Sequence, residues 1–200
     1  MVAASRICAL AMIIVFVGSP PRLEAKEPAE MGIPPETVAD YLHAVIEADR
    51  TFYTIHVVER LQAKGVVVAS QNWLHANTLP LPAQFLMESN RLATMTGAKI
   101  GYRLISLWPI NEQNKPATQS EDAALKDVLA KPDHPRTELI QDGERRYFQA
   151  IYADRAVSQA CIGCHNAHPN SPKRDFKMNE VMGGMVITIP VGHGPARQDR

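Results

Sequence analysis

Three residues late in the chain, Cys161, Cys164 and His165, have types and a spacing that can carry chemistry. In a Cys-x-x-Cys-His pattern the two thiols lie about one helical turn apart and can add to the two vinyl groups of one haem. The histidine after the second thiol can then bind the iron as its proximal ligand. The pattern therefore predicts one covalently attached haem c, with thioether bonds at Cys161 and Cys164 and with His165 on the iron.

The same motif has three other interpretations: a redox-active thiol pair, half of a zinc site, and coincidence. A structural zinc site takes four ligands, and Cys8 is the only cysteine outside the motif. A thioredoxin-like pair is expected near a βαβ unit, whereas this pair lies late in the sequence. Haem attachment is therefore the interpretation that the sequence favours.

Residues 1–25 have the features of a secretory signal peptide. Arg6 supplies a positive charge, and the apolar run over 7–17 is too short to span a membrane comfortably. Cleavage after Ala25 would remove Cys8 and leave the two motif thiols, as expected for haem attachment in an oxidising, exported compartment. We therefore expect a periplasmic or otherwise exported protein, held at a membrane only if the segment is retained.

The pattern of apolar residues and chain breakers predicts an α+β fold. Apolar residues recur every three or four positions over 36–64 without Gly or Pro, which indicates one long N-terminal helix. Asp142-Gly143 between two β-prone runs indicates a hairpin. The other expected elements are helices over 83–94, 120–130 (with Ser120 as N-cap) and 156–161, and strands over 102–108, 137–141, 145–152 and 183–190. The strands are expected to form an antiparallel sheet that the helices cover.

Further motifs resemble those of a single-haem c-type family with a PAS-like fold, long catalogued as a domain of unknown function. They include Ala48-Asp49-Arg50-Thr51, Leu79-Pro80-Leu81-Pro82, Ser106-Leu107-Trp108-Pro109 and the stretch from Cys164 to Phe176. The resemblance covers residues 36–191, between an expected linker over 26–35 and a polar tail over 192–200. It implies a PAS-like antiparallel sheet flanked by helices, with the haem c attachment segment near the C-terminus and the haem against the sheet.

The sixth iron ligand is open. Some members of that family resemble a Cys/His-ligated haem, with a cysteine from the long helix, and residues 36–64 of this chain contain no cysteine. The same helix offers His56 as a nitrogen ligand and Tyr53 as a tyrosinate or a hydrogen-bond donor to a bound gas. Alternatively, His56 is a partly exposed helix residue and Tyr53 a core aromatic residue with a hydrogen-bonded hydroxyl. Gly183 and Gly184 are expected to let a strand pack closely against the porphyrin.

The composition limits the class of partner. Lys and Arg number 21, as do Asp and Glu, so the formal net charge is zero. Without a basic field, the sequence gives no sign of nucleic-acid binding. A haem site implies a diatomic gas or a redox protein as partner, and the long helix leaves a homodimer open.

The resemblance implies that the protein senses redox state or a diatomic gas, because members of the family occur alone in the periplasm or as extracytoplasmic sensor portions. The alternative is a periplasmic electron-transfer cytochrome, which needs a stable six-coordinate iron. A third hypothesis is a small haem enzyme acting on peroxide or nitrogen oxides, in which His56 is an acid–base group rather than a ligand. The resemblance itself implies no enzyme activity.

Overall fold

The structure is a computed structural model that describes residues 32–193. The predicted signal peptide, residues 26–31 of the predicted linker and the last seven residues of the predicted tail lie outside the described residues. None of the helices within 32–193 is long and apolar enough to cross a membrane.

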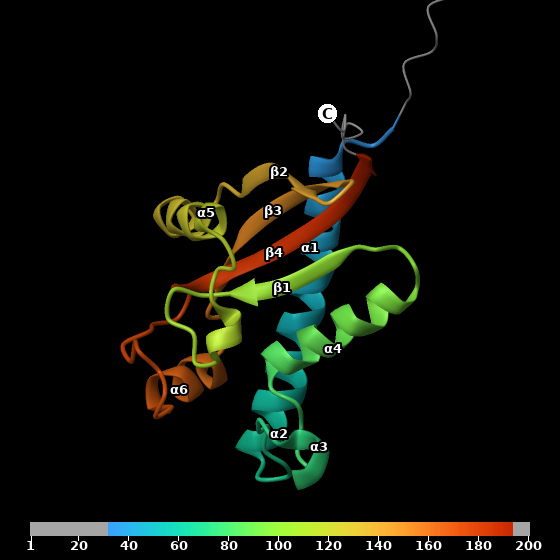
Figure 1. Ribbon diagram of the computed structural model, residues 1–200. Coiled ribbons are helices and arrows are strands. Elements are labelled where there is room, and N and C mark those ends of the chain that lie inside the picture. The colour runs from blue at the N-terminus through green and yellow to red at the C-terminus, as the bar shows by residue number, and fades with distance from the viewer. Residues whose placement is uncertain (1–31, 194–200) are drawn as a thin grey trace, which may run out of the picture. The chain divides into compact units, whose positions relative to one another are not determined.

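Within the described residues, four antiparallel strands form a sheet in the order β1-β4-β3-β2 (Figure 1). The strands are β1 (Gly101–Ile105), β2 (Arg136–Asp142), β3 (Arg145–Arg155) and β4 (Val181–His193). The hairpin between β2 and β3 turns at Gly143, whose φ of +59° suits glycine. The α+β fold class with an antiparallel sheet is therefore confirmed.

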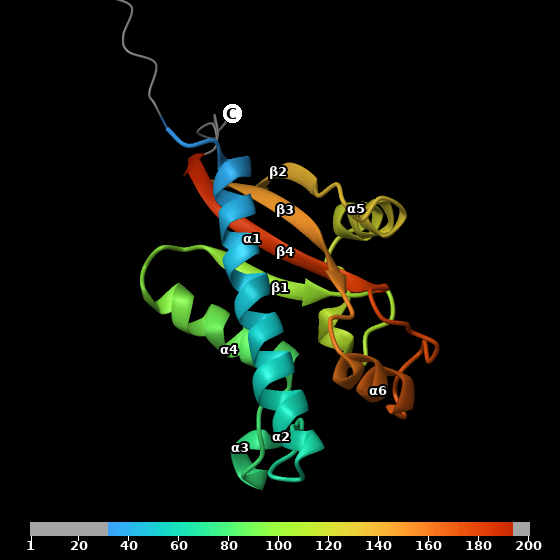
Figure 2. The ribbon, with the colours of Figure 1, turned by 180° about the vertical axis from the view of Figure 1, so that it is seen from behind.

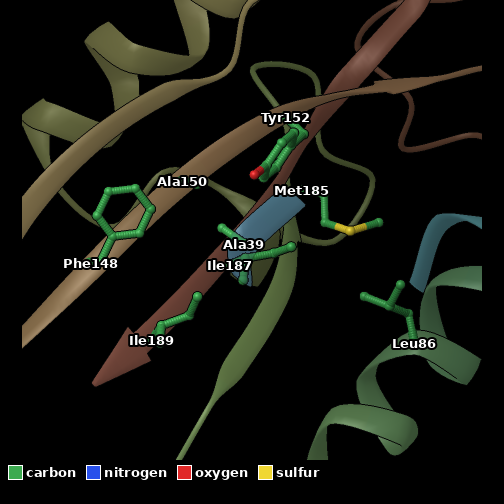
Figure 3. Close-up of a cluster of buried hydrophobic side chains, with 8 residues drawn as sticks. All are labelled: Ala39, Leu86, Phe148, Ala150, Tyr152, Met185, Ile187 and Ile189. Carbon is green, nitrogen blue, oxygen red and sulfur yellow. The ribbon is translucent and has the colours of Figure 1, made fainter. Parts of the chain in front are cut away.

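Helices cover both faces of the sheet. α1 (Pro35–Phe52) and α4 (Pro82–Met95) pack on one face, and α5 (Gln119–Ala130) packs on the other (Figures 1 and 2). Neighbouring residues on a strand point to opposite faces, so Met185 belongs to the core under α1 and Val186 to the core under α5. Figure 3 shows the first core, which consists of Ala39, Leu86, Phe148, Ala150, Tyr152, Met185, Ile187 and Ile189.

The long N-terminal helix runs through three segments without a break. α1 continues into a π-helical stretch, η1 (Tyr53–Glu59), and then into α2 (Arg60–Ala63). The helix begins at Pro35, one residue before the predicted start, and proline suits this first position because its missing N–H has no helical partner there. The π-helical stretch was not predicted, and such stretches are frequent at functional sites. A short helix, α3 (Trp73–Ala76), lies between α2 and α4.

Two of the differences between predicted and observed element boundaries have a clear local cause. β1 ends at Ile105, because the amide of Ser106 donates instead to the carbonyl of Asn114 in the short 3₁₀ segment η2 (Glu112–Asn114), at 2.8 Å. α5 is capped by Thr118 rather than Ser120, since the Thr118 side chain accepts the hydrogen bond from the first turn. Serine and threonine are both good N-caps, so residue type alone did not separate the two.

Gly183 and Gly184 lie in β4 and are surrounded by protein. A Cβ atom at Gly183 would clash with the carbonyl oxygen of Ile105. A Cβ atom at Gly184 would lie 2.8 Å from Ile151 Cγ2 and 3.0 Å from Leu125 Cδ1. The expectation that these glycines make room for a porphyrin is therefore wrong: they let β4 pack closely against β1 and α5.

Candidate functional site

The Cys-x-x-Cys-His motif lies on α6 (Gln159–Ala167), a helix inserted between β3 and β4. The short helix predicted over 156–161 thus begins and ends later and carries the whole motif. Ser158 caps it, and its hydroxyl oxygen accepts a hydrogen bond from the amide of Cys161 at 3.4 Å. One helix therefore holds both thiols and the histidine in a fixed local arrangement.

Both motif cysteines are free thiols. Cys161 is half-buried and Cys164 is exposed. Burial, and to a smaller degree the neighbouring thiol of Cys161, raise the pKa of Cys164 above its ordinary value. At neutral pH Cys164 is therefore protonated. Two thiols that are not joined in a disulfide and lie one turn apart are what two thioether bonds to a haem require.

His165 is half-buried, and its ring meets that of Phe176 edge-on at 5.9 Å between centroids. Burial lowers the pKa of His165, so the imidazole is neutral at pH 7. Its Nδ1 atom is buried and has no hydrogen-bond partner among the described residues. Neutral imidazole is the form that binds metal, so this side chain fits the role of a haem ligand.

The segment after α6 is fastened to the motif. Asn166 Nδ2 donates to the carbonyl of Phe176, and the Phe176 amide donates back to Asn166 Oδ1, both at 3.0 Å. Lys173 Nζ lies over the Phe176 ring at 4.8 Å and pairs with Asp175 and Glu180. These contacts hold the ring of Phe176 in place, and His165 packs against that ring.

The stretch η1, which contains both candidate distal residues, lies against α6. The Tyr53 ring stacks on Phe85 at 4.5 Å, and its hydroxyl donates to the carbonyl of Pro80 at 2.7 Å. His56 is exposed, with its ring 4.9 Å from that of Phe52. The structure thus brings the two candidates onto a helix beside the motif, while the role of each at the iron stays a prediction.

A buried ion cluster beside α6 was missed in the sequence. Arg50 is 5% exposed and donates to Glu47 at 3.0 Å and to Asp154, the next-to-last residue of β3. Burial lowers the pKa of Arg50, but Asp154 and Glu47 outweigh this and raise it, with a smaller contribution from Cys161. The guanidinium is therefore a permanent positive charge whose field reaches the attachment helix. Its only sequence signal was its place in the Ala48–Thr51 motif.

The remaining histidines and methionines of the described chain have other surroundings. His43 stacks on Tyr152 at 4.0 Å, and its Nε2 atom is buried without a partner among residues 32–193. Met182 and Met185 are buried in apolar clusters, whereas Met178 is 46% exposed. In the described range, no group of three or more His, Cys, Asp or Glu side chains is arranged to hold a metal ion.

The chain was compared with known proteins. A family model described as Tll0287-like matches residues 34–190. Among solved structures, the crystal structure of the cyanobacterial heme-protein Tll0287 is similar at 17% sequence identity, with a TM-score of 0.45. That match covers 82% of this chain and 100% of the other. No curated protein matches the chain.

Proposed function

Because this chain belongs to the Tll0287-like family, we propose that it is a single-haem c-type protein that senses redox state or a diatomic gas. The main support for the haem comes from α6, which places two free thiols beside the neutral imidazole of His165. The Nδ1 atom of that imidazole has no hydrogen-bond partner within the described residues. Cys161 and Cys164 would hold the haem through thioether bonds, and His165 would bind the iron. The family shares its name with Tll0287, itself described as a heme-protein, which supports the same cofactor.

When bound, the haem supplies an iron that changes oxidation state and accepts a further ligand. The protein's own residues prepare its place. Burial keeps His165 neutral, Phe176 fixes the orientation of its ring, and Asn166 fixes Phe176. The buried cation of Arg50 favours negative charge near α6.

His56 is the proposed sixth ligand, and Tyr53 is the weaker candidate. Burial raises the pKa of Tyr53, which disfavours the tyrosinate. Its hydroxyl is also already bonded to the carbonyl of Pro80. The His56 side chain is exposed, and rotation of its ring away from Phe52 leaves no hydrogen bond behind in the described part of the chain.

The contact between α6 and η1 supports sensing. A π-helical turn can return to α-helical geometry, so this neighbour can respond when His165 moves. Electron transfer is the second candidate, and the exposure of Cys164 favours it because a haem edge there is reachable by a redox protein. Hydrogen exchange separates the two roles: a sensor changes exchange over Tyr53–Glu59 on reduction or carbon monoxide binding, whereas a carrier leaves it unchanged.

The haem assignment is tested by replacing both thiols. Cys161→Ser with Cys164→Ser is expected to lose the haem that survives denaturing electrophoresis, and haem retained there would refute covalent attachment.

For the sixth ligand, absorption and EPR spectra of His56→Ala are compared with those of His134→Ala, an exposed histidine outside the site. A low-spin spectrum lost only in His56→Ala supports ligation, and a high-spin spectrum unchanged by it excludes it.

Export and a PAS-like arrangement complete the proposal. A PAS-like fold is supported by the pairing of the first and last strands, β1 and β4, beside β3. Export is supported by the apolar segment over 7–17. Deletion of residues 2–25 is expected to abolish haem attachment in a host that attaches haem c outside the cytoplasm, and full loading of that variant would contradict export.

A further inference from the structure

Asp154 lies beside the base of α6, where the end of β3 meets the segment that carries the motif. It is the next-to-last residue of β3 and precedes Ala156 by two positions. Ala156 and Phe176 belong to the apolar cluster against which Cys161 packs. Phe176 also meets the ring of His165 edge-on. A short stretch of backbone and one packed cluster therefore join Asp154 to the motif.

Arg50 fixes the Asp154 carboxylate from the side of the long helix. Side chains alternate along a strand, so Asp154 points to the same face as Tyr152, the face that α1 covers. Its side chain is 13% exposed and accepts a hydrogen bond from Arg50, which lies in the last turn of α1. Glu47 also accepts from this guanidinium. Asp154 is therefore a negative charge that is fixed in place and poorly screened by water.

The charge of Asp154 acts on His165. Burial lowers the pKa of His165, and the negative charge of Asp154 opposes this effect. The Nδ1 atom of His165 is buried and has no partner within residues 32–193. A histidine that binds a metal through one nitrogen donates its other N–H to a carboxylate, a carbonyl or water, and this raises its basicity as a ligand. A carboxylate that acts on the ring has the same direction of effect.

We propose that Asp154 strengthens His165 as an electron donor to the iron and thereby lowers the reduction potential of the haem, while Arg50 holds the carboxylate in place and limits its effect. The inference rests on the proposed function, because it needs a haem at α6. Ferric haem carries one positive charge more than ferrous haem, so a negative charge nearby stabilises the ferric state. Asp154 is a positioning residue, since it acts through His165.

Potentiometric titration of the haem-loaded protein tests this role, with dithionite as reductant and ferricyanide as oxidant of the one-electron couple. Asp154→Asn keeps the shape of the side chain and removes its charge, so the midpoint potential is expected to rise. Asp154→Glu keeps the charge and should stay close to the wild type. Glu88→Gln is the matched control, because Glu88 also pairs with an arginine but lies exposed on α4, and it should leave the potential unchanged.

The opposing role of Arg50 is tested in the same titration. Arg50→Met is expected to lower the midpoint potential, because the charge of Asp154 then acts unopposed, and a potential that does not fall would refute this role. If Arg50→Met does not fold, the Asp154 variants decide, since they leave Arg50 its pairing with Glu47.

The outcomes separate this inference from the proposed function. Haem staining after denaturing electrophoresis first establishes that each variant is loaded. A midpoint potential that is unchanged in Asp154→Asn, or that rises equally in Asp154→Glu, would overturn the inference alone, because the charge is then not the cause. A wild type that holds no haem would refute the proposed function and this inference together.

Discussion

Replacing Arg50 by methionine tests the buried ion cluster beside α6. The Arg50 side chain is 6% exposed, and those of its partners Asp154 and Glu47 are 13% and 26% exposed. Removing the guanidinium leaves two carboxylates without the cation that stabilises them. Breaking a buried ion pair costs about 3–5 kcal/mol. Because Glu47 keeps some contact with water, we expect the free energy of unfolding to fall by about 3 kcal/mol, the lower end of that range.

Arg91→Met is the matched control. Arg91 pairs with Glu88 at 2.8 Å with the same three-residue spacing as Arg50 and Glu47, but the two side chains are 60% and 48% exposed. An exposed pair contributes little, so the loss should stay below about 0.5 kcal/mol. Urea unfolding at pH 7, followed by circular dichroism, measures both variants. An Arg50→Met loss no larger than that of Arg91→Met would refute the cluster's role in stability.

The pH dependence of the Arg50→Met loss checks its cause. Burial already raises the pKa of Glu47, and the cation of Arg50 partly opposes this. Without Arg50 the folded-state pKa of Glu47 rises further above its unfolded value, so the folded state binds the proton more readily. Stability of the variant therefore recovers as pH falls through that raised pKa toward about 4.3, the unfolded value. A loss that grows between pH 7 and pH 5 would contradict this explanation.

Three further variants test single contacts by thermal or urea unfolding. Gly183→Ala should lower the free energy of unfolding by about 3 kcal/mol, because the new Cβ atom would clash with the carbonyl of Ile105. Gly163→Ala should not lower it, because a Cβ atom at Gly163 has no neighbour within 4 Å. Burial lowers the pKa of His43, so wild-type stability falls as pH drops below about 6.5. His43→Phe should weaken this dependence, and the part that remains comes from His165, whose pKa burial also lowers. Tyr53→Phe should lose about 1 kcal/mol with the hydrogen bond to Pro80.

Local patterns were enough for the parts of the fold that neighbouring residues decide. The hairpin at Asp142-Gly143 was predicted because only a few residue types suit its turn. The long helix was predicted from its apolar spacing, although this spacing did not reveal η1, because no glycine or proline marks where the helix widens. The grouping of Cys161, Cys164 and His165 followed from one helix, since their separation is set by the helical pitch.

Long-range contacts explain what the sequence did not reveal. Arg50 is buried because Asp154 neutralises it, and the two residues lie 104 positions apart. Charged residues are rarely buried without such a partner. Because Asp154 is distant in the sequence, the residues near Arg50 did not indicate that it is buried. Tyr53 agrees with the core-aromatic alternative, because Phe85 and Pro80 take up its ring and hydroxyl. The contact of α6 with η1 likewise joins segments about a hundred residues apart.

The surroundings of α6 favour one direction for any movement of the motif. On the sheet side, two backbone hydrogen bonds join the two ends of the segment that contains α6. The Ala156 amide donates to the carbonyl of Glu180 at 2.9 Å, and the Asn179 amide donates to the carbonyl of Ala156 at 3.0 Å. On the other side lies η1, whose π-helical hydrogen bonds already depart from α geometry and can be exchanged for α-helical ones without breaking a strand. A shift of His165 is therefore taken up more easily by η1 than by β3 and β4. Because η1 continues α1, such a shift would be passed along that helix.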